Sequence, residues 1–281
     1  MSMFVLVGAT GTIGRQAMDL LLQSGAEVAA VTRDRLARLP DAARPVLGDP
    51  SRPGTLAGWP QQAEGILLSP RAVGSATDEL LALGAARGAR RVVVLSSATV
   101  EHPAGHERFR AEFRAVEDAV RRSGLEWTFL RCADFAANTL AWAPQIRTTG
   151  VVRGAHPRAA TSPVHERDVA ETAARALTEG GHSGRAYVLT GPDSLDQQDK
   201  VRLIAEAVGR KLEFEEVAPE RVRHAMLAQG LPEDVPDRLL GSLADYAVQA
   251  GPTTDTVARI LERPARSFAA WASENASAFT A

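Results

Sequence analysis

Three glycines spaced three residues apart, Gly8, Gly11 and Gly14, are the strongest chemical signal in this 281-residue sequence. An apolar run over residues 4–7 precedes them, and a helix is predicted over 13–23. In that context Gly8 permits a tight turn, Gly11 lets a phosphate approach the backbone, and Gly14 lets the helix pack closely. The amides and positive end of the helix attract a pyrophosphate. We therefore predict a dinucleotide site, the alternative being a glycine-rich turn without a ligand. The predicted contacts are Gly8, Thr10, Gly11, Thr12, Ile13 and Gly14.

The end of the next predicted strand, residues 28–31, selects between the two pyridine dinucleotides. A carboxylate at this point would bond the adenosine ribose hydroxyls. The sequence has Thr32 and Arg33 instead, and a guanidinium offers a planar fork to a 2′-phosphate. We therefore predict NADP(H) as the cofactor, with Arg33 as its contact. Two alternatives stay open: Asp34 serves a ribose, or Arg33 is an ordinary surface residue.

Candidate proton donors lie further along the chain. His102 and His106 occupy a loop before a predicted helix over 108–122, and histidine transfers protons near neutral pH. Together with Ser97 they are the predicted catalytic residues. His165 falls near the same edge of the predicted sheet. The remaining candidate acids are Glu101, Glu107 and Asp134.

Alternating strands and helices must position these residues through about the first 190 positions. Repeated strand–helix–strand units imply a parallel sheet with helices on both faces. We predict an α/β fold with a Rossmann-type doubly wound parallel sheet and a smaller, mostly helical C-terminal substrate region. The expected domains are 1–185 for NADP(H) and 192–281 for the substrate, with a later strand over 186–191. The predicted strands are 4–7, 28–31, 44–47, 65–69, 92–95 and 127–130, and the predicted C-terminal helices are 196–209, 219–229, 238–249 and 254–262, with a turn over 231–237.

Composition excludes several classes of protein. The net charge of −2 gives no broad attraction to nucleic acid or anionic lipid. A single cysteine, Cys132, excludes an internal disulfide framework and a cysteine-rich metal site. No apolar run approaches the ~20 residues of a membrane span, and the start shows no signal peptide. We expect a cytoplasmic protein with a small organic substrate, no metal, and an oligomeric state that the sequence leaves open.

Several longer motifs carry a family resemblance. The segments "VLVGATGTIGRQAMDLLLQSGAEVAAVTRD", "GDPSRPGTL", "VVVLSSA", "VEDAVRRSGLEWTFLRCADFAAN" and "SPVHERDVAETAARAL" resemble the NmrA-like family of atypical short-chain dehydrogenases/reductases. The resemblance covers nearly the whole chain and implies the fold and an NADP(H) cofactor. It leaves the substrate open, because that family holds both NADP(H)-sensing regulators and reductases of quinones, lignans, isoflavones and iminium alkaloids.

The resemblance also implies positional roles. Asp49 would lie near the adenine, residues 131–138 would pass beside the nicotinamide, and Ser96 and Ser97 would face its ribose. Leu68, Ser69 and Pro70 would lie along the cofactor. Simpler roles remain open: Ser96 and Ser97 end a strand, and Asp49 forms a turn before proline. The predicted substrate pocket comprises Phe109, Phe113, Cys132, Phe135, Trp142 and His165, with Cys132 alternatively an inert packed thiol.

The superfamily's usual Tyr-x-x-x-Lys pair is missing. The only tyrosines are Tyr187 and Tyr246, and neither has a lysine four residues later. If Glu117 matches the glutamate that follows the lysine in the extended branch, Phe109 and Phe113 hold the two catalytic positions. Hydride transfer without that pair suits an acceptor that is already activated, such as a quinone, iminium ion or conjugated compound. The alternatives are a non-catalytic NADP(H) sensor and a non-redox isomerase or cyclase.

Overall fold

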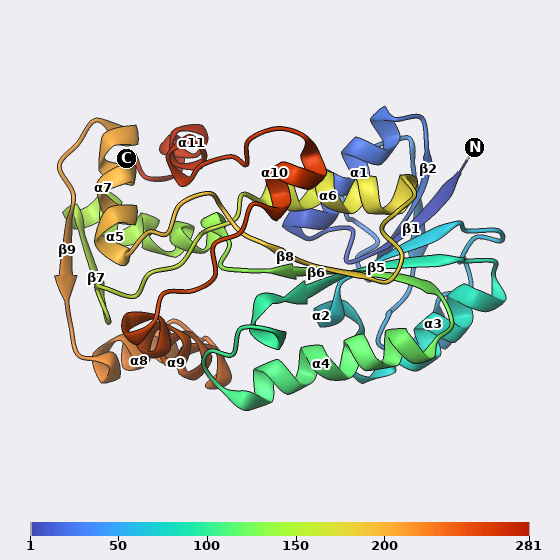
Figure 1. Ribbon diagram of the computed structural model, residues 1–281, viewed down its shortest axis with the longest axis horizontal. Coiled ribbons are helices and arrows are strands. Elements are labelled where there is room, and N and C mark those ends of the chain that lie inside the picture. The colour runs from blue at the N-terminus through green and yellow to red at the C-terminus, as the bar shows by residue number, and fades with distance from the viewer. Residues whose placement is uncertain (1, 281) are drawn as a thin grey trace. The chain divides into compact units, whose positions relative to one another are not determined.

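Seven strands form one sheet in the computed structural model, which describes residues 2–280 (Figure 1). Their order is β3-β2-β1-β4-β5-β6-β8, and the pairings from β3 across to β6 are parallel. The strands are β1 Met3–Val7, β2 Glu27–Thr32, β3 Ala43–Leu47, β4 Gly65–Leu68, β5 Arg91–Ser97, β6 Glu126–Cys132 and β8 Arg185–Leu189. This order confirms the predicted Rossmann-type sheet.

Helices cover both faces of this sheet, as Figure 1 shows. Val5, Val92 and their neighbours on one face form a cluster with Leu80 of α3 and Val116 of α4. On the other face α6 contacts β4, β5 and β6 and packs against α1. The strands are therefore apolar on both faces, which is why their sequences read as continuous apolar runs. The helices are α1 Thr12–Gln23, α2 Pro70–Val73, α3 Thr77–Ala86, α4 Glu107–Arg122 and α6 Glu166–Thr178.

The strand order reverses between β1 and β4. These two adjacent strands lead to helices on opposite faces of the sheet, and in doubly wound folds ligands bind beyond the carboxyl ends of the strands at such a point. The turn after Val7 of β1 and the turn after Leu68 of β4 meet there, because the amide of Ser69 donates to the carbonyl of Val7 at 3.0 Å. The glycine-rich loop lies at this point.

Two compact units make up the chain, and they interleave along the sequence. Unit 1 holds residues 1–97, 112–132 and 166–188, and unit 2 holds 98–111, 133–165 and 189–281. The α4 helix therefore begins in unit 2 and continues into unit 1. The predicted division into a cofactor domain over 1–185 and a substrate domain over 192–281 remains a prediction.

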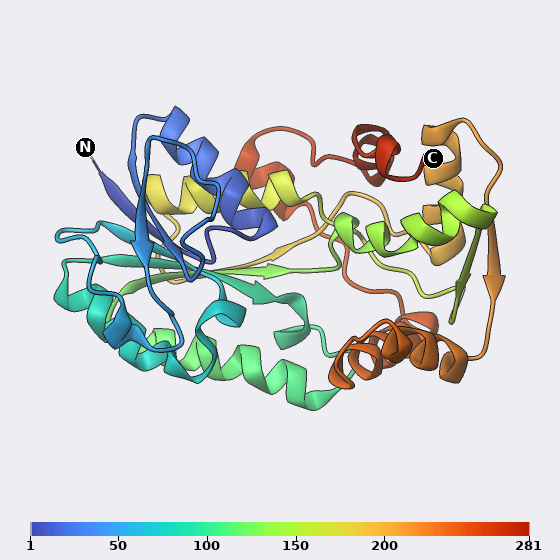
Figure 2. The same cartoon turned by 180° about the vertical axis from the view of Figure 1, so that it is seen from behind.

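Unit 2 has its own small sheet and core. β7 and β9 pair in parallel, with α5 beside β7 and α7 beside β9 (Figure 2). The aromatic rings of Phe268, Trp271 and Phe279 pack into its buried cluster. The elements are α5 Ala143–Thr149, β7 Val151–Gly154, α7 Gln197–Val208, β9 Glu213–Glu216, α8 Pro219–Ala228, α9 Asp234–Val248, α10 Thr256–Leu261 and α11 Phe268–Glu274.

The turn predicted over residues 231–237 is wrong in its second half. The α9 helix begins at Asp234, with Pro236 as its third residue. Proline costs little there, because the first amides of a helix have no partner inside it. Two further strands, β7 and β9, were not predicted, since four residues such as the Glu-Phe-Glu-Glu of β9 show no usable alternation.

None of the helices within residues 2–280 is long and apolar enough to cross a membrane. The same residues contain no group of three or more His, Cys, Asp or Glu side chains arranged to hold a metal ion.

Candidate functional site

The conformation of the glycine loop depends on Gly8 and Gly14. Gly8 has a φ of +97°, and a Cβ there would lie 2.7 Å from the Cβ of Ser69. A Cβ on Gly14 would lie 2.2 Å from the carbonyl oxygen of Gly8. A side chain at either position would therefore push β1, β4 and α1 apart.

Gly11 keeps the outer side of the loop open. It has an ordinary φ of −74°, and an added Cβ would meet only the carbonyl of Gly8, at 3.3 Å. Thr10, Gly11 and Thr12 are exposed, whereas Ile13 is buried against the sheet. The first turn of α1 has no side-chain cap and no acidic residue. Its amides and positive end can therefore receive an anion.

The turn after β4 lies beside the glycine loop. Leu68 is fully buried, while Ser69 and Pro70 are partly exposed. Ser69 directly precedes the short α2 helix, and its Cβ is the atom that excludes a side chain at Gly8. Of the three residues predicted along the cofactor, Ser69 and Pro70 therefore present accessible atoms.

The loop after β2 exposes Arg33 and uses Asp34 to hold its own shape. The amide of Asp34 donates to Thr32 Oγ1 at 3.1 Å, and Asp34 Oδ1 accepts from the amide of Leu36 at 2.8 Å. One carboxylate oxygen of Asp34 is thus committed to the turn. This geometry favours Arg33 over Asp34 as the group available to a ligand.

Asp49 is also committed to its own turn. Its Oδ1 accepts from the Ser51 hydroxyl at 2.7 Å and the Ser51 amide at 3.0 Å, and its Oδ2 pairs with Arg52 at 3.1 Å. The bonds from Ser51, followed by Arg52, hold the pKa of Asp49 below its usual value. The carboxylate of Asp49 is therefore already bonded within its turn. The predicted contact between this loop and the adenine remains a prediction.

Ser96 belongs to a buried ionic network in unit 1. Its hydroxyl donates to Glu117 Oε1 at 2.7 Å, and Glu117 is fully buried. Arg131 donates to both oxygens of Glu117, at 3.0 and 2.7 Å, and Arg121 to one at 3.1 Å. Ser97 is also buried, and in a strand it faces the opposite side of the sheet. Ser96 is therefore turned toward α4.

His102 and His106 lie in the part of unit 2 that precedes α4, and both are exposed. The Nε2 atom of His102 lies 3.9 Å from Glu101. The ring of His106 lies beside Gly241 of α9, and the amide of Gly105 donates to Asp245 of α9 at 2.7 Å. This loop is thus fastened to α9. Another candidate acid, Glu107, pairs with Arg110.

The predicted pocket residues fall into different surroundings. In unit 2, Phe109 is partly buried under the guanidinium of Arg238, 4.6 Å from its ring centre, and Trp142 packs against the core of that unit. In unit 1, Phe113 is partly buried. Cys132 is 5% exposed, and burial raises the pKa of its thiol to about 12. The thiol therefore stays protonated at neutral pH.

Phe135 and His165 lie in two segments of unit 2 that an isolated bridge brings together. Phe135 forms an isolated parallel bridge with Val164, the residue before His165. Phe135 is partly exposed, whereas His165 is buried and its Nε2 lies 3.1 Å from Glu274 Oε2. His165 is therefore already engaged by α11.

A buried lysine in unit 2 was not predicted as functional. Lys200 is 2% exposed, and its ammonium donates to Asp134 Oδ2 at 3.1 Å and to Thr161 Oγ1 at 2.7 Å. Asp134 also accepts from Asn138 at 2.7 Å. The burial of Tyr246 and, to a smaller extent, the negative charge of Asp134 raise the pKa of Tyr246 to about 12. The one feature of the sequence that could have drawn attention to Lys200 is the scarcity of lysine, because the chain has only two.

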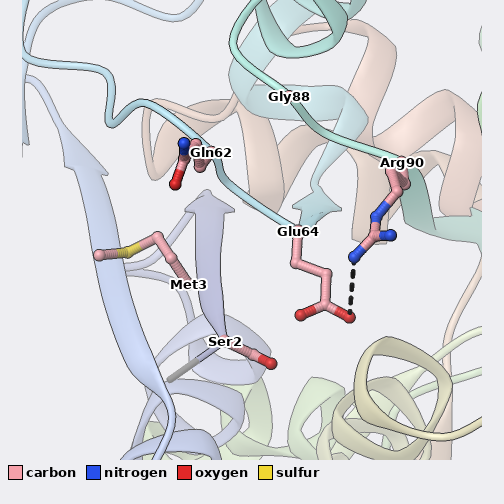
Figure 3. A pocket seen from close by; sticks show the side chains of 6 residues that line it. All are labelled: Ser2, Met3, Gln62, Glu64, Gly88 and Arg90. Carbon is pink, nitrogen blue, oxygen red and sulfur yellow. Dashed lines mark ion pairs between the residues drawn. The ribbon is translucent and has the colours of Figure 1, made fainter.

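A surface pocket lies away from the glycine loop (Figure 3). It is lined by Ser2, Met3, Gln62, Glu64, Gly88 and Arg90. These residues start β1 or precede β4 and β5, so the pocket is at the amino ends of the strands. An ion pair of 3.9 Å between Glu64 and Arg90 spans part of it. It is therefore at the opposite edge from the predicted cofactor crevice.

Comparison with known proteins agrees with this geometry. A family model described as NAD(P)H-binding matches residues 8–180. The chain is 35% identical to a (4-alkanoyl-5-oxo-2,5-dihydrofuran-3-yl)methyl phosphate reductase from Streptomyces griseus, over 99% of both proteins. It is 31% identical to an NAD(P)H azoreductase from Xenophilus azovorans, over 99% of this chain and all of that protein.

A solved structure shows the same fold over nearly the whole length. An NADPH-dependent quinone oxidoreductase from Escherichia coli matches with a TM-score of 0.82 at 20% identity, covering 97% of this chain and 98% of that one. The reductase names of the full-length relatives agree with the predicted enzyme class. The family match confirms the predicted pyridine-nucleotide cofactor. The chain belongs to the NAD(P)H-binding family.

Proposed function

We propose that this protein is an NADPH-dependent reductase that delivers hydride to an activated small organic acceptor. The observation that carries the proposal is the open, uncapped turn at Gly11 and Thr12. It offers backbone amides and the positive end of α1 to a pyrophosphate, and Gly8 and Gly14 hold it tightly to the sheet. The bound nicotinamide would supply the hydride from its C4 atom.

The preference for NADPH rests on Arg33. Its exposed guanidinium follows β2, where a ribose-binding carboxylate would favour NADH. One carboxylate oxygen of Asp34 accepts a hydrogen bond from the amide of Leu36, which also favours NADPH over NADH. Arg33 would bind the 2′-phosphate through charge-assisted hydrogen bonds.

The acceptor class follows from the residues that are missing. Neither tyrosine of the chain has a lysine four residues later, and Phe109 and Phe113 cannot donate a proton. A simple ketone would need a donor for its developing alkoxide, whereas a quinone, an iminium ion or a conjugated carbonyl accepts hydride with little early proton help. The two full-length relatives are named for an oxo- and alkanoyl-substituted dihydrofuran and for azo compounds, which supports this class. His102, His106 and Ser97 remain the proposed later proton donors.

The direct test is turnover. Purified protein is mixed with NADPH and, in turn, a quinone, an azo dye, an acylated unsaturated lactone, a cyclic iminium compound and a simple ketone, and cofactor oxidation is followed by absorbance. Oxidation with at least one of the first four and none with the ketone supports the proposal. Saturable NADPH binding with no oxidation by any acceptor contradicts it and supports a cofactor sensor.

A further inference from the structure

Arg15 connects two loops that the sequence keeps far apart. It is the fourth residue of α1 and is exposed. Its Nε donates to the carbonyl of Thr10 at 2.9 Å, and its Nη1 donates to the carbonyl of Arg38 at 3.0 Å. One guanidinium therefore joins the glycine loop to the end of the loop that follows β2.

The second of these loops, residues 33–38, has little else to hold it. Arg33, Asp34, Arg35 and Leu36 are all exposed, and Leu36 is 87% exposed. The internal bonds of the loop are short in range: Asp34 Oδ1 accepts from the amide of Leu36 and the Asp34 carbonyl from that of Ala37. These bonds shape the loop, and the bond from the amide of Asp34 to Thr32 Oγ1 ties its start to the end of β2. The bond from Arg15 ties its other end, at Arg38, to the glycine loop.

We propose that Arg15 is a positioning residue for the cofactor's 2′-phosphate. By holding the carbonyls of Thr10 and Arg38 together, it fixes the loop that carries Arg33 beside the pyrophosphate turn. The inference rests on the proposed NADPH preference and adds a second determinant to it. We call the two hydrogen bonds from Arg15 to the carbonyls of Thr10 and Arg38 the Arg15 clasp. Binding of NADPH should depend on this clasp more than binding of NADH does, because NADH has no 2′-phosphate for Arg33 to bind.

Two substitutions of Arg15 separate the effect of its hydrogen bonds from the effect of its positive charge. Arg15→Met removes both hydrogen bonds and the charge, whereas Arg15→Lys keeps the charge but lacks the planar fork that reaches two carbonyls. Arg44→Met is the matched control. Arg44 lies exposed on β3 of the same unit, and its bond to the carbonyl of Gly58 is long, at 3.4 Å.

The experiment measures the dissociation constants of NADPH and NADH for the wild type and the three variants, together with hydrogen exchange over residues 33–38. Each lost hydrogen bond is worth a factor of roughly 2–10. We expect the NADPH constant to rise about 3–10-fold in Arg15→Met and nearly as much in Arg15→Lys, with NADH changing less than about 2-fold. Exchange in the loop should accelerate in both Arg15 variants and stay unchanged in Arg44→Met.

The outcomes distinguish this inference from the proposed function. A wild type that binds NADPH no better than NADH overturns the cofactor preference and the role of Arg15 with it. A ratio of the NADPH and NADH dissociation constants that is the same in Arg15→Met as in the wild type overturns the role of Arg15 alone, whatever the exchange rates. An Arg15→Lys variant that behaves as the wild type overturns the clasp in favour of a charge effect.

Discussion

At the scale of single residues, Arg33 and Asp34 are neighbours that favour different cofactors. Asp34 binds the amide of Leu36 and so shapes the loop, whereas Arg33 is exposed and is the residue that we propose for the 2′-phosphate. The sequence shows which residues stand there, and the hydrogen bonds show how Asp34 is used. A residue's type therefore decides its possible chemistry, and its local contacts decide whether that chemistry is free to act.

Arg33→Ala tests this assignment. Because a charged hydrogen-bonded group contributes about 1.5–3 kcal/mol, loss of Arg33 should weaken NADPH binding about 10–100-fold. NADH binding should change less than about 2-fold, since NADH lacks the 2′-phosphate. Fluorescence titration of each cofactor measures both values. Equal losses for the two cofactors would place Arg33 outside the 2′-phosphate site.

Cys132 should make the folded protein less stable at alkaline pH. Burial raises the pKa of its thiol from an ordinary value of 9.0 to about 12, so above pH 9 the unfolded chain loses a proton that the folded chain keeps. The free energy of unfolding therefore falls as pH rises through this window. The difference between the wild type and Cys132→Ala should shrink by about 1.4 kcal/mol between pH 8 and pH 10. Urea unfolding under reducing conditions measures it, and a difference independent of pH would contradict the buried thiol.

At the scale of elements, the junction of β1 with α1 depends on glycines that do different work. A Cβ on Gly14 collides with the carbonyl of Gly8 at 2.2 Å, while a Cβ on Gly11 only touches it at 3.3 Å. The motif already predicted close packing at Gly14 and phosphate access at Gly11. The distances agree with the packing role of Gly14, and the access role of Gly11 remains a prediction.

Paired substitutions separate these roles. Gly14→Ala should destabilise the fold by about 1–3 kcal/mol, as overpacked sites do. Gly11→Ala should cost less than about 1 kcal/mol yet weaken NADPH at least about 10-fold, because the methyl group occupies the approach of the phosphate. Thermal unfolding and cofactor titration of both variants check this. A destabilised Gly11→Ala, or a fully stable Gly14→Ala, would reverse the assignment.

The two lysines offer a matched pair for unit 2. Lys200 is buried between Asp134 and Thr161, whereas Lys211 pairs with Glu213 at 85% exposure. Lys200→Met leaves the Asp134 carboxylate uncompensated and should cost about 3 kcal/mol, near the lower end for a buried pair because Asp134 is 24% exposed. Lys211→Met should cost less than about 0.5 kcal/mol. Urea midpoints compare them, and equal costs would contradict the buried pair.

Long apolar runs explain how much of the fold the sequence predicts. Residues 4–7, 65–68 and 92–95 lie in strands because both faces of the sheet are covered, and that pattern is readable without a structure. The Lys200–Asp134 pair joins positions 66 residues apart, and no local pattern carries such a contact. The same holds for Ser96, whose partner Glu117 is visible only once β5 and α4 are packed together.

At the scale of the whole molecule, the full-length relatives share the entire chain and not only its cofactor-binding part. The two reductases align over 99% of this protein, and the family model covers residues 8–180. The predicted Rossmann-type sheet and NAD(P)H-binding family are therefore confirmed together. The acceptor class remains a prediction, which rests on the missing Tyr-x-x-x-Lys pair.

The most direct measurement is a calorimetric titration of the purified protein with NADPH and, separately, with NADH. We predict saturable binding of one NADPH per chain, at least about 10-fold tighter than NADH, as expected for a bound 2′-phosphate. Absence of saturable heat with either nucleotide, or binding of NADH as tight as NADPH, would contradict it.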